Sequence, residues 1–276
     1  MKHKRFAIGF LVFLLAISIL LVLVYPMASV YTTLPQTPNG GFQLALLIWV
    51  SSLMTLLIGL ISGYVIVPFY LAIHKIINHR RSSYGIQDIL IDDNTKQPNR
   101  FLQGVYPALI SVNLAIFLAP YFMDVILIEA ASEWAVENNY FLAMIGLMMF
   151  TSGPALGIFV AAWMLNDSGV GYTNSINAKE RGEFVERRSI GGWFLQFLKG
   201  YSGISVIISF FQVISGWMAI SAEPLHQIWL TIILVFLLPI IITGCLNVFL
   251  FDISSRKRRT GYVLWFAKKM GIRNQL

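Results

Sequence analysis

The sequence predicts an all-α integral membrane protein, a polytopic bundle of six transmembrane helices with both termini in the cytoplasm. Its 276 residues are 57% hydrophobic and only 12% charged, with a mean hydropathy of +0.71. Soluble domains are roughly 45–50% apolar and about 25% charged. Six segments are apolar and long enough to cross a bilayer core of roughly 30 Å, and every lysine and arginine falls on one side of them. So little charge cannot cover a water-exposed surface, which excludes a soluble enzyme, a disordered chain and a fibrous repeat.

The expected spans follow one another along a single transmembrane domain, residues 1–276. The first span follows the basic segment 1–5, exceeds the apolar region of a signal peptide in length and has no Ala-x-Ala cleavage site. We therefore expect it to remain as an uncleaved signal anchor. The six spans are expected at residues 6–25, 42–72, 103–128, 140–165, 194–220 and 228–251.

The second expected span is longer than a bilayer requires. Its 31 residues would extend about 46 Å as a helix. The helix could tilt and kink at Pro68, or it could continue past the membrane through residues 74–77. We expect continuation, because Lys75 and the basic residues after it would then meet headgroups or water.

The distribution of basic residues predicts the orientation. With the N-terminus inside, the inner segments 1–5, 73–102, 166–199 and 252–276 contain all 20 lysine and arginine residues. An excess of these residues in short loops marks the cytoplasmic side. The net charge of +7 is therefore explained by orientation in the cell membrane, and we expect no binding to nucleic acid.

The basic tail, residues 252–276, mixes aromatic residues with lysines and arginines. Such a segment is typical of an interfacial amphipathic helix on anionic inner-leaflet lipids, either as a regulatory element or as a passive anchor. The basic residues expected to contact lipid are Arg256, Lys257, Arg258, Arg259, Lys268 and Lys269.

Polar and helix-breaking residues near the middle of the spans are the candidates for a binding cavity. A glycine followed by proline loosens a helix and frees backbone groups, which transporters use to bind substrate. The alternative is a plain kink whose freed carbonyls are satisfied by neighbouring Ser or Thr side chains. The candidate residues are Asn113, Thr151, Ser152, Gly153, Pro154, Pro239 and Thr243.

Small residues spaced four apart in three of the spans have another explanation. They form the small-residue pattern that lets membrane helices approach closely. The pairs are Gly59 and Gly63 in the second span, Gly153 and Gly157 in the fourth, and Ser205 and Ser209 in the fifth. Close helix packing accounts for these positions without a ligand.

Two further features lie at the edges of the membrane. Lys199 and Asp252 fall at comparable depth and could form an ion pair, although Lys199 could instead extend to the lipid phosphates. On the outer side, a stripe of acids could attract a cation or a basic partner, or could simply be hydrated. Its members are Asp124, Glu129, Glu133 and Glu137.

Several chemistries are excluded by residue type. The single cysteine, Cys245, cannot form an internal disulfide, and the four histidines show no metal-binding spacing. Ser152-Gly153 resembles the catalytic serine of rhomboid proteases, but the spans offer no histidine to activate it. We expect no metal, no cofactor and no ionisable group at mid-membrane depth, which disfavours proton coupling.

The resulting hypothesis is a non-enzymatic membrane protein that acts as a subunit or scaffold of a larger assembly, with a protein partner or a second copy of itself. The alternative is a permease or channel for a small neutral or lipid-like solute. In size, six spans and inward termini the chain is similar to the permease subunits of ABC-2-type exporters, which implies the membrane subunit of an exporter as one form of this alternative. An intramembrane enzyme is the third hypothesis.

Overall fold

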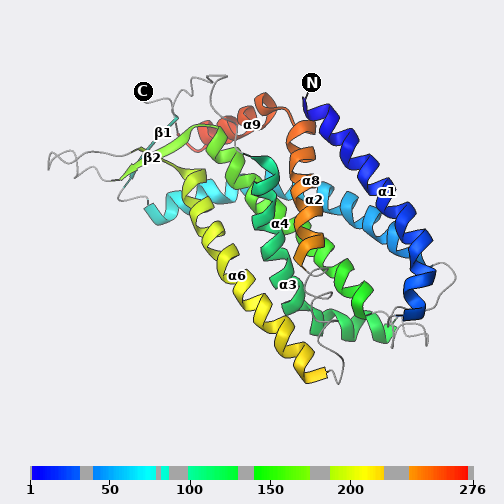
Figure 1. The fold of residues 1–276 in the computed structure, drawn as a ribbon. Helices are drawn as coiled ribbons and strands as arrows, with labels where there is room; N and C mark the ends of the chain where they lie inside the picture. Colours follow the sequence, from blue (N-terminus) through cyan, green and yellow to red (C-terminus); the bar gives the residue numbers. More distant parts are fainter. Residues whose placement is uncertain are drawn as a thin grey trace.

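The structure, a computed structural model, describes residues 2–31, 40–78, 82–86, 99–129, 140–174, 187–220 and 236–272. Over these residues the chain forms a helical bundle with a small sheet at one end (Figure 1). The predicted helical class is thereby confirmed. The helices are α1 (Lys2–Tyr31), α2 (Gly40–Asn78), α3 (Arg100–Glu129), α4 (Tyr140–Asp167), α6 (Ile190–Ile220), α8 (Leu238–Ile253) and α9 (Arg256–Lys269).

Several of these helices can cross a membrane. Three described segments are long and apolar enough, namely Ile48–Asn78, Arg100–Leu118 and Ile190–Ser215. A fourth is added if Pro239–Phe251 and Arg256–Lys269, which are bent by 80° from each other, form one broken span.

The second helix continues past Pro68 as expected, but its Lys75 meets protein, because the Nζ donates to the Met270 carbonyl oxygen at 2.8 Å. α2 is a single helix of 39 residues that contains Pro68 and runs on through His74 and Lys75 to Asn78. At 1.5 Å per residue it is about 58 Å long, well beyond a hydrocarbon core of roughly 30 Å. Its last turns therefore belong to the end of the molecule that also carries the sheet.

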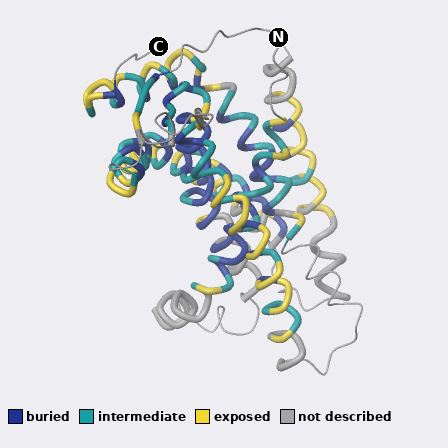
Figure 2. Tube along the Cα trace, turned by 90° about the vertical axis from the view of Figure 1, so that its left-hand side faces the viewer, coloured by how far each residue is buried: buried dark blue, intermediate teal, exposed yellow. Residues whose placement is uncertain are grey.

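The fourth helix is the centre of the bundle. α4 packs against α2, α3, α6 and α8, and residues such as Leu156, Phe159 and Trp163 are at most 2% exposed. A helix that is apolar on all sides is stable where protein or lipid surrounds it. α4 is therefore shielded by protein over its described second half, and Figure 2 shows this buried centre in dark blue.

The outer helices present apolar side chains to the surroundings. α1 exposes Leu15 and Leu23, α2 exposes Ile61 and Phe69, and α6 exposes Phe211, each by more than half of its surface. A water-soluble surface rarely carries so much contiguous apolar area. These faces fit contact with lipid.

Small residues bring α2 and α4 together, and the close packing expected from their spacing occurs between these two helices. A Cβ added to Gly63 would lie 2.7 Å from Val160, and one added to Gly153 would lie 2.8 Å from Ile58. Both distances are shorter than an ordinary carbon contact of about 3.5–4.0 Å. The glycines are therefore required by the close approach of the two helices.

A three-stranded antiparallel sheet closes one end of the bundle. β1 (Ser82–Ile86) pairs with β2 (Val170–Asn174), which pairs with β3 (Arg187–Ser189), in the order β1-β2-β3. The sequence alone predicts no strands in these loops. The sheet therefore joins three segments: the one that follows α2, the one that follows α4 and the one that precedes α6.

Helix α9 lies at the same end as the sheet and as the first turn of α1 (Figure 1). Ser255 caps its start by accepting a hydrogen bond from the Arg258 N–H. Its end turns at Gly271, whose φ is 83°, and the Ile272 N–H donates to the Ala267 carbonyl at 2.9 Å. This is the glycine-ended arrangement that terminates many helices, and it directs Ile272, 2% exposed, into the core.

We call the sheet and residues 256–272 the cap. Apolar side chains of the cap, among them Ile86, Tyr172, Val263 and Ala267, belong to one core cluster with Phe159 of α4. The cap therefore has no separate core of its own and is continuous with the bundle.

Candidate functional site

Two of the hydroxyl groups expected at mid-membrane depth, those of Thr151 and Ser152, form a compact cluster with Ser111 between α3 and α4. Ser152 Oγ lies 2.8 Å from the Met148 carbonyl oxygen, to which it donates, and 2.8 Å from Ser111 Oγ. Thr151 Oγ1 lies 3.0 Å from the carbonyl oxygens of Ser111 and Leu147. Side chains that bond the preceding turn and the facing helix in this way lock two membrane helices together.

Asn113 lies apart from this cluster. Two residues along a helix correspond to a rotation of about 200°, so Asn113 and Ser111 lie on opposite sides of α3. The Asn113 Oδ1 accepts a hydrogen bond from the Tyr201 hydroxyl of α6 at 3.2 Å. The structure thus places Thr151 and Ser152 with Ser111, a residue that the sequence analysis did not select, and places Asn113 against α6.

The two helix-breaking prolines differ in position. Pro154 lies within the continuous helix α4, whereas Pro239 occupies the first turn of α8. A π-helical turn at residues 236–237 directly precedes α8, so the change of helix type falls beside this proline. Residues 221–235, which precede α8, lie outside the described residues, so the predicted start of the sixth span does as well.

Thr243 lies on α8 where that helix meets α3. Its side chain is fully buried, and its Oγ1 has no hydrogen-bond partner among the described residues. A Cβ added to Gly104 would lie 2.7 Å from the Thr243 carbonyl oxygen and 2.6 Å from the Gly244 Cα. Gly104 and Gly244 therefore bring the backbones of α3 and α8 together beside this hydroxyl.

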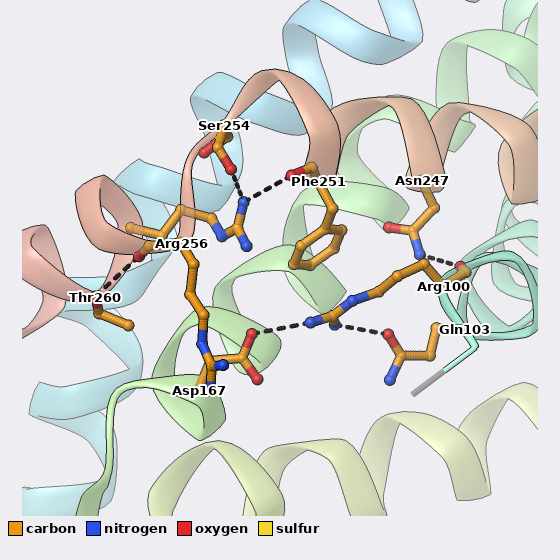
Figure 3. A network of polar contacts seen from close by, with 9 residues as sticks. Arg100, Gln103, Asp167, Asn247, Phe251, Ser254, Arg256 and Thr260 are labelled. Carbon is orange, nitrogen blue, oxygen red and sulfur yellow. Dashed lines mark hydrogen bonds and ion pairs between the residues drawn. The ribbon is translucent and has the colours of Figure 1, made fainter. Parts of the chain in front are cut away.

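The sequence did not predict a charged junction that lies beside the cap. Here the start of α3, the end of α4 and the end of α8 meet the start of α9 (Figure 3). Arg100 on α3 forms an ion pair with Asp167 on α4, with Nη2 3.1 Å from Oδ2. Its Nη1 donates to Gln103 Oε1 at 2.9 Å, and its backbone carbonyl accepts a hydrogen bond from Asn247 of α8. One arginine thus joins three helices.

Two further arginines reach this junction from α9. Arg259 is only 4% exposed, and its Nη1 donates to the carbonyl oxygens of Phe251, at 3.2 Å, and Ser254. Figure 3 shows the Arg256 side chain extending toward the carboxylate of Asp167. Asp167 attracts the Arg259 guanidinium, while Arg100 and Arg256 repel it.

Phe251 separates two of these guanidinium groups. The Arg100 Cζ lies 3.9 Å from the centroid of its ring and the Arg259 Cζ lies 4.4 Å from it. A cation over an aromatic face is stabilised by the ring quadrupole, by about 2 kcal/mol when desolvated. The ring therefore reduces the cost of holding two like charges near each other.

His74, near the end of α2, forms a second buried polar group where that helix meets the cap. Its ring contacts Tyr84, Tyr172, Trp193 and Phe194, with centroid distances of 5.7, 4.4, 5.1 and 6.3 Å. Its Nδ1 lies 3.1 Å from the Tyr84 hydroxyl, which donates to the His74 carbonyl oxygen at 3.1 Å. The histidine holds β1 against the end of α2.

The two features expected at the membrane edges are the Lys199–Asp252 ion pair and the outer acidic stripe. Lys199 is exposed, and its Nζ lies 5.3 Å from the centroid of the Tyr106 ring, while the Asp252 side chain lies outside the described part of the structure. In the expected acidic stripe, the side chains of Asp124 and Glu129 lie outside the described part as well. Glu133 and Glu137 also lie outside the described residues.

The basic residues of α9 fall into two groups. Lys257, Arg258, Lys268 and Lys269 are exposed, whereas Arg256 is partly covered and Arg259 is buried. All six residues were expected to contact lipid, because their spacing alone does not show which face of the helix the protein covers.

No protein-family model, no curated protein and no solved structure matches this chain.

Proposed function

We propose that this chain is a non-enzymatic membrane subunit or scaffold with six spans and both termini in the cytoplasm, and that the cap is the surface on which a larger assembly is built. The observation that carries the proposal is the packing of the cap. Two inner loops and the tail, which are far apart in the sequence, form one sheet and one helix that share the core of the bundle. A preformed surface of this kind lowers the entropy lost when a partner binds.

The arrangement of the ends supports this topology. The start of α1 lies at the same end of the molecule as α9 (Figure 1), as an even number of crossings requires. The positive-inside distribution assigns that end to the cytoplasm. α9 is bent by 80° from α8, so it would lie along the inner surface of a bilayer that α8 crosses.

The mid-membrane hydroxyls also favour a structural role. Ser111, Thr151 and Ser152 bond to one another and to helix carbonyls. A group whose hydrogen bonds are already made within the protein contributes little to binding a solute, because those bonds must first be broken.

Purification from the native membrane in mild detergent, followed by native mass spectrometry, tests the proposal. We expect a second chain, or a second copy, in fixed stoichiometry. The association should weaken on charge reversal of the exposed cap residues Lys257 and Arg258. The matched control is reversal of Lys2 and Lys4 at the start of α1. A monomer that transports solute would contradict the proposal.

The second candidate is a permease for a small neutral solute, and one observation favours it. Ser205 and Ser209 on α6 and Thr243 on α8 are buried, and their hydroxyl oxygens have no partner among the described residues. Buried hydroxyls without partners are available to a polar ligand. Solute uptake into liposomes should then fall strongly for the S205A/S209A and Thr243→Val variants and less for Ser152→Leu. Equal uptake by all variants would reject this candidate.

A further inference from the structure

The charged junction holds more positive than negative charge. Its described side chains include three guanidinium groups, those of Arg100, Arg256 and Arg259, and one carboxylate, that of Asp167. Arg100 is ion-paired with Asp167, and Arg256 extends toward it (Figure 3). Buried charges are costly unless they are paired. We propose that the junction binds a phosphate group that carries about two negative charges, either the monoester headgroup of an anionic lipid or a free phosphate ion.

The donors that such a group needs are present. A guanidinium has five N–H donors, and the described contacts leave several of them free. The Nε atoms of Arg256 and Arg259 are buried and have no partner among the described residues. The whole Arg259 residue is only 4% exposed. The planar fork of arginine matches phosphate oxygens in pairs.

The start of α9 adds a further source of positive potential. This helix of 14 residues begins at Arg256, so the positive end of its dipole lies at the junction. Backbone N–H groups at a helix start are common phosphate ligands. Here the helix start and the unpaired arginine donors are independent observations that favour the same kind of ligand.

The position of the junction suits a headgroup. Arg100 stands at the first residue of a membrane-crossing segment, Asp167 is the last residue of α4 and Arg256 follows α8. All three therefore lie where helices leave the hydrocarbon, which is the depth of lipid phosphates. The Arg100 and Asp167 side chains remain 17% and 14% exposed, so the junction can be reached from outside.

Binding can be measured on the full-length protein in detergent and in nanodiscs. The probes are inorganic phosphate, with chloride at equal ionic strength as reference, and nanodiscs with phosphatidic acid or with phosphatidylcholine alone. The readouts are the apparent affinity and the melting temperature, which rises when a ligand binds only the folded state. The variants are R256Q and R259Q, and the matched control is R258Q, an exposed arginine on the same helix.

We expect R256Q to weaken binding at least tenfold and R258Q to change it less than twofold. If R259Q does not fold, R256Q decides the result. Binding of inorganic phosphate alone would identify a free ion as the ligand, and binding of phosphatidic acid alone would identify a lipid headgroup. The proposal is overturned if neither probe binds above its reference, or if R258Q loses as much affinity as R256Q, because the attraction would then be a diffuse surface effect. It does not depend on the scaffold role.

Discussion

At the residue scale, His74 shows how a buried polar side chain is satisfied. The ring is fully covered. Its Nδ1–H donates to the Tyr84 oxygen at 3.1 Å, and its Nε2 accepts from Asn78 Nδ2 at 3.4 Å. Burial, and then the charge of Tyr172, raise the pKa of Tyr84 to about 12, so the Tyr84 hydroxyl is protonated and able to donate near neutral pH.

Removal of the Tyr84 hydroxyl alone should therefore be costly. In Tyr84→Phe the buried His74 Nδ1–H loses its acceptor, and we expect the free energy of unfolding to fall by about 1–3 kcal/mol. The double variant H74F/Y84F removes both polar partners and should be less destabilised than the sum of the two single variants. Unfolding in detergent, followed by tryptophan fluorescence, measures both values, and strict additivity would show that the bond contributes nothing.

The ion pair at the junction leads to another residue-scale prediction. Asp167 is the carboxylate that faces Arg100, Arg256 and Arg259, so Asp167→Asn leaves like charges partly buried together. We expect a loss of about 3 kcal/mol or more in the free energy of unfolding, as for other broken buried pairs. The exposed control R258Q should change it by less than about 0.5 kcal/mol, and equal melting temperatures for the two variants would contradict the expectation.

At the element scale, the contact between α2 and α4 depends on glycine. A Cβ at Gly157 would lie 2.8 Å from the Ser62 Cβ and 3.2 Å from the Gly63 nitrogen, so Gly157→Ala must push the helices apart. We expect a destabilisation of about 1–3 kcal/mol. Gly203 on α6 has nothing within 4 Å of an added Cβ, so Gly203→Ala should be neutral or stabilise by up to about 1 kcal/mol. The melting temperatures of Gly157→Ala and Gly203→Ala test these two expectations. Similar shifts for both variants would contradict the close approach of α2 and α4.

At the scale of the whole molecule, the six-span topology can be tested with single cysteines. The chain has one cysteine, so Cys245→Ser provides a cysteine-free background. In that background we expect an impermeant maleimide to label Thr37→Cys, in the predicted first outer loop, on intact cells. Lys257→Cys, on the exposed side of α9, should react only after permeabilisation, because the proposed topology places the cap in the cytoplasm. The reverse labelling pattern would invert the proposed orientation.

The sequence predicted the helices better than the sites. The expected segments 103–128, 140–165 and 194–220 lie within α3, α4 and α6, since a long apolar run specifies a helix without reference to any partner. Asn113, by contrast, could not be separated from Ser111 by composition. Which of the two faces α4 depends on the rotation of α3 in the bundle.

The sequence by itself determined a helical chain with long apolar segments and with glycines spaced for close helix packing, because these properties depend on residue type and spacing along one helix. That these glycines bring α2 and α4 together was decided by the tertiary structure. Only the tertiary structure decided that residues 82–86, 170–174 and 187–189 form one sheet, and that Arg259 points inward while its neighbour Arg258 is exposed. The physical reason is the range of the interactions. Strands of three to five residues are stabilised by partners distant in the sequence, and the side of α9 that the protein covers is set by its 80° turn from α8.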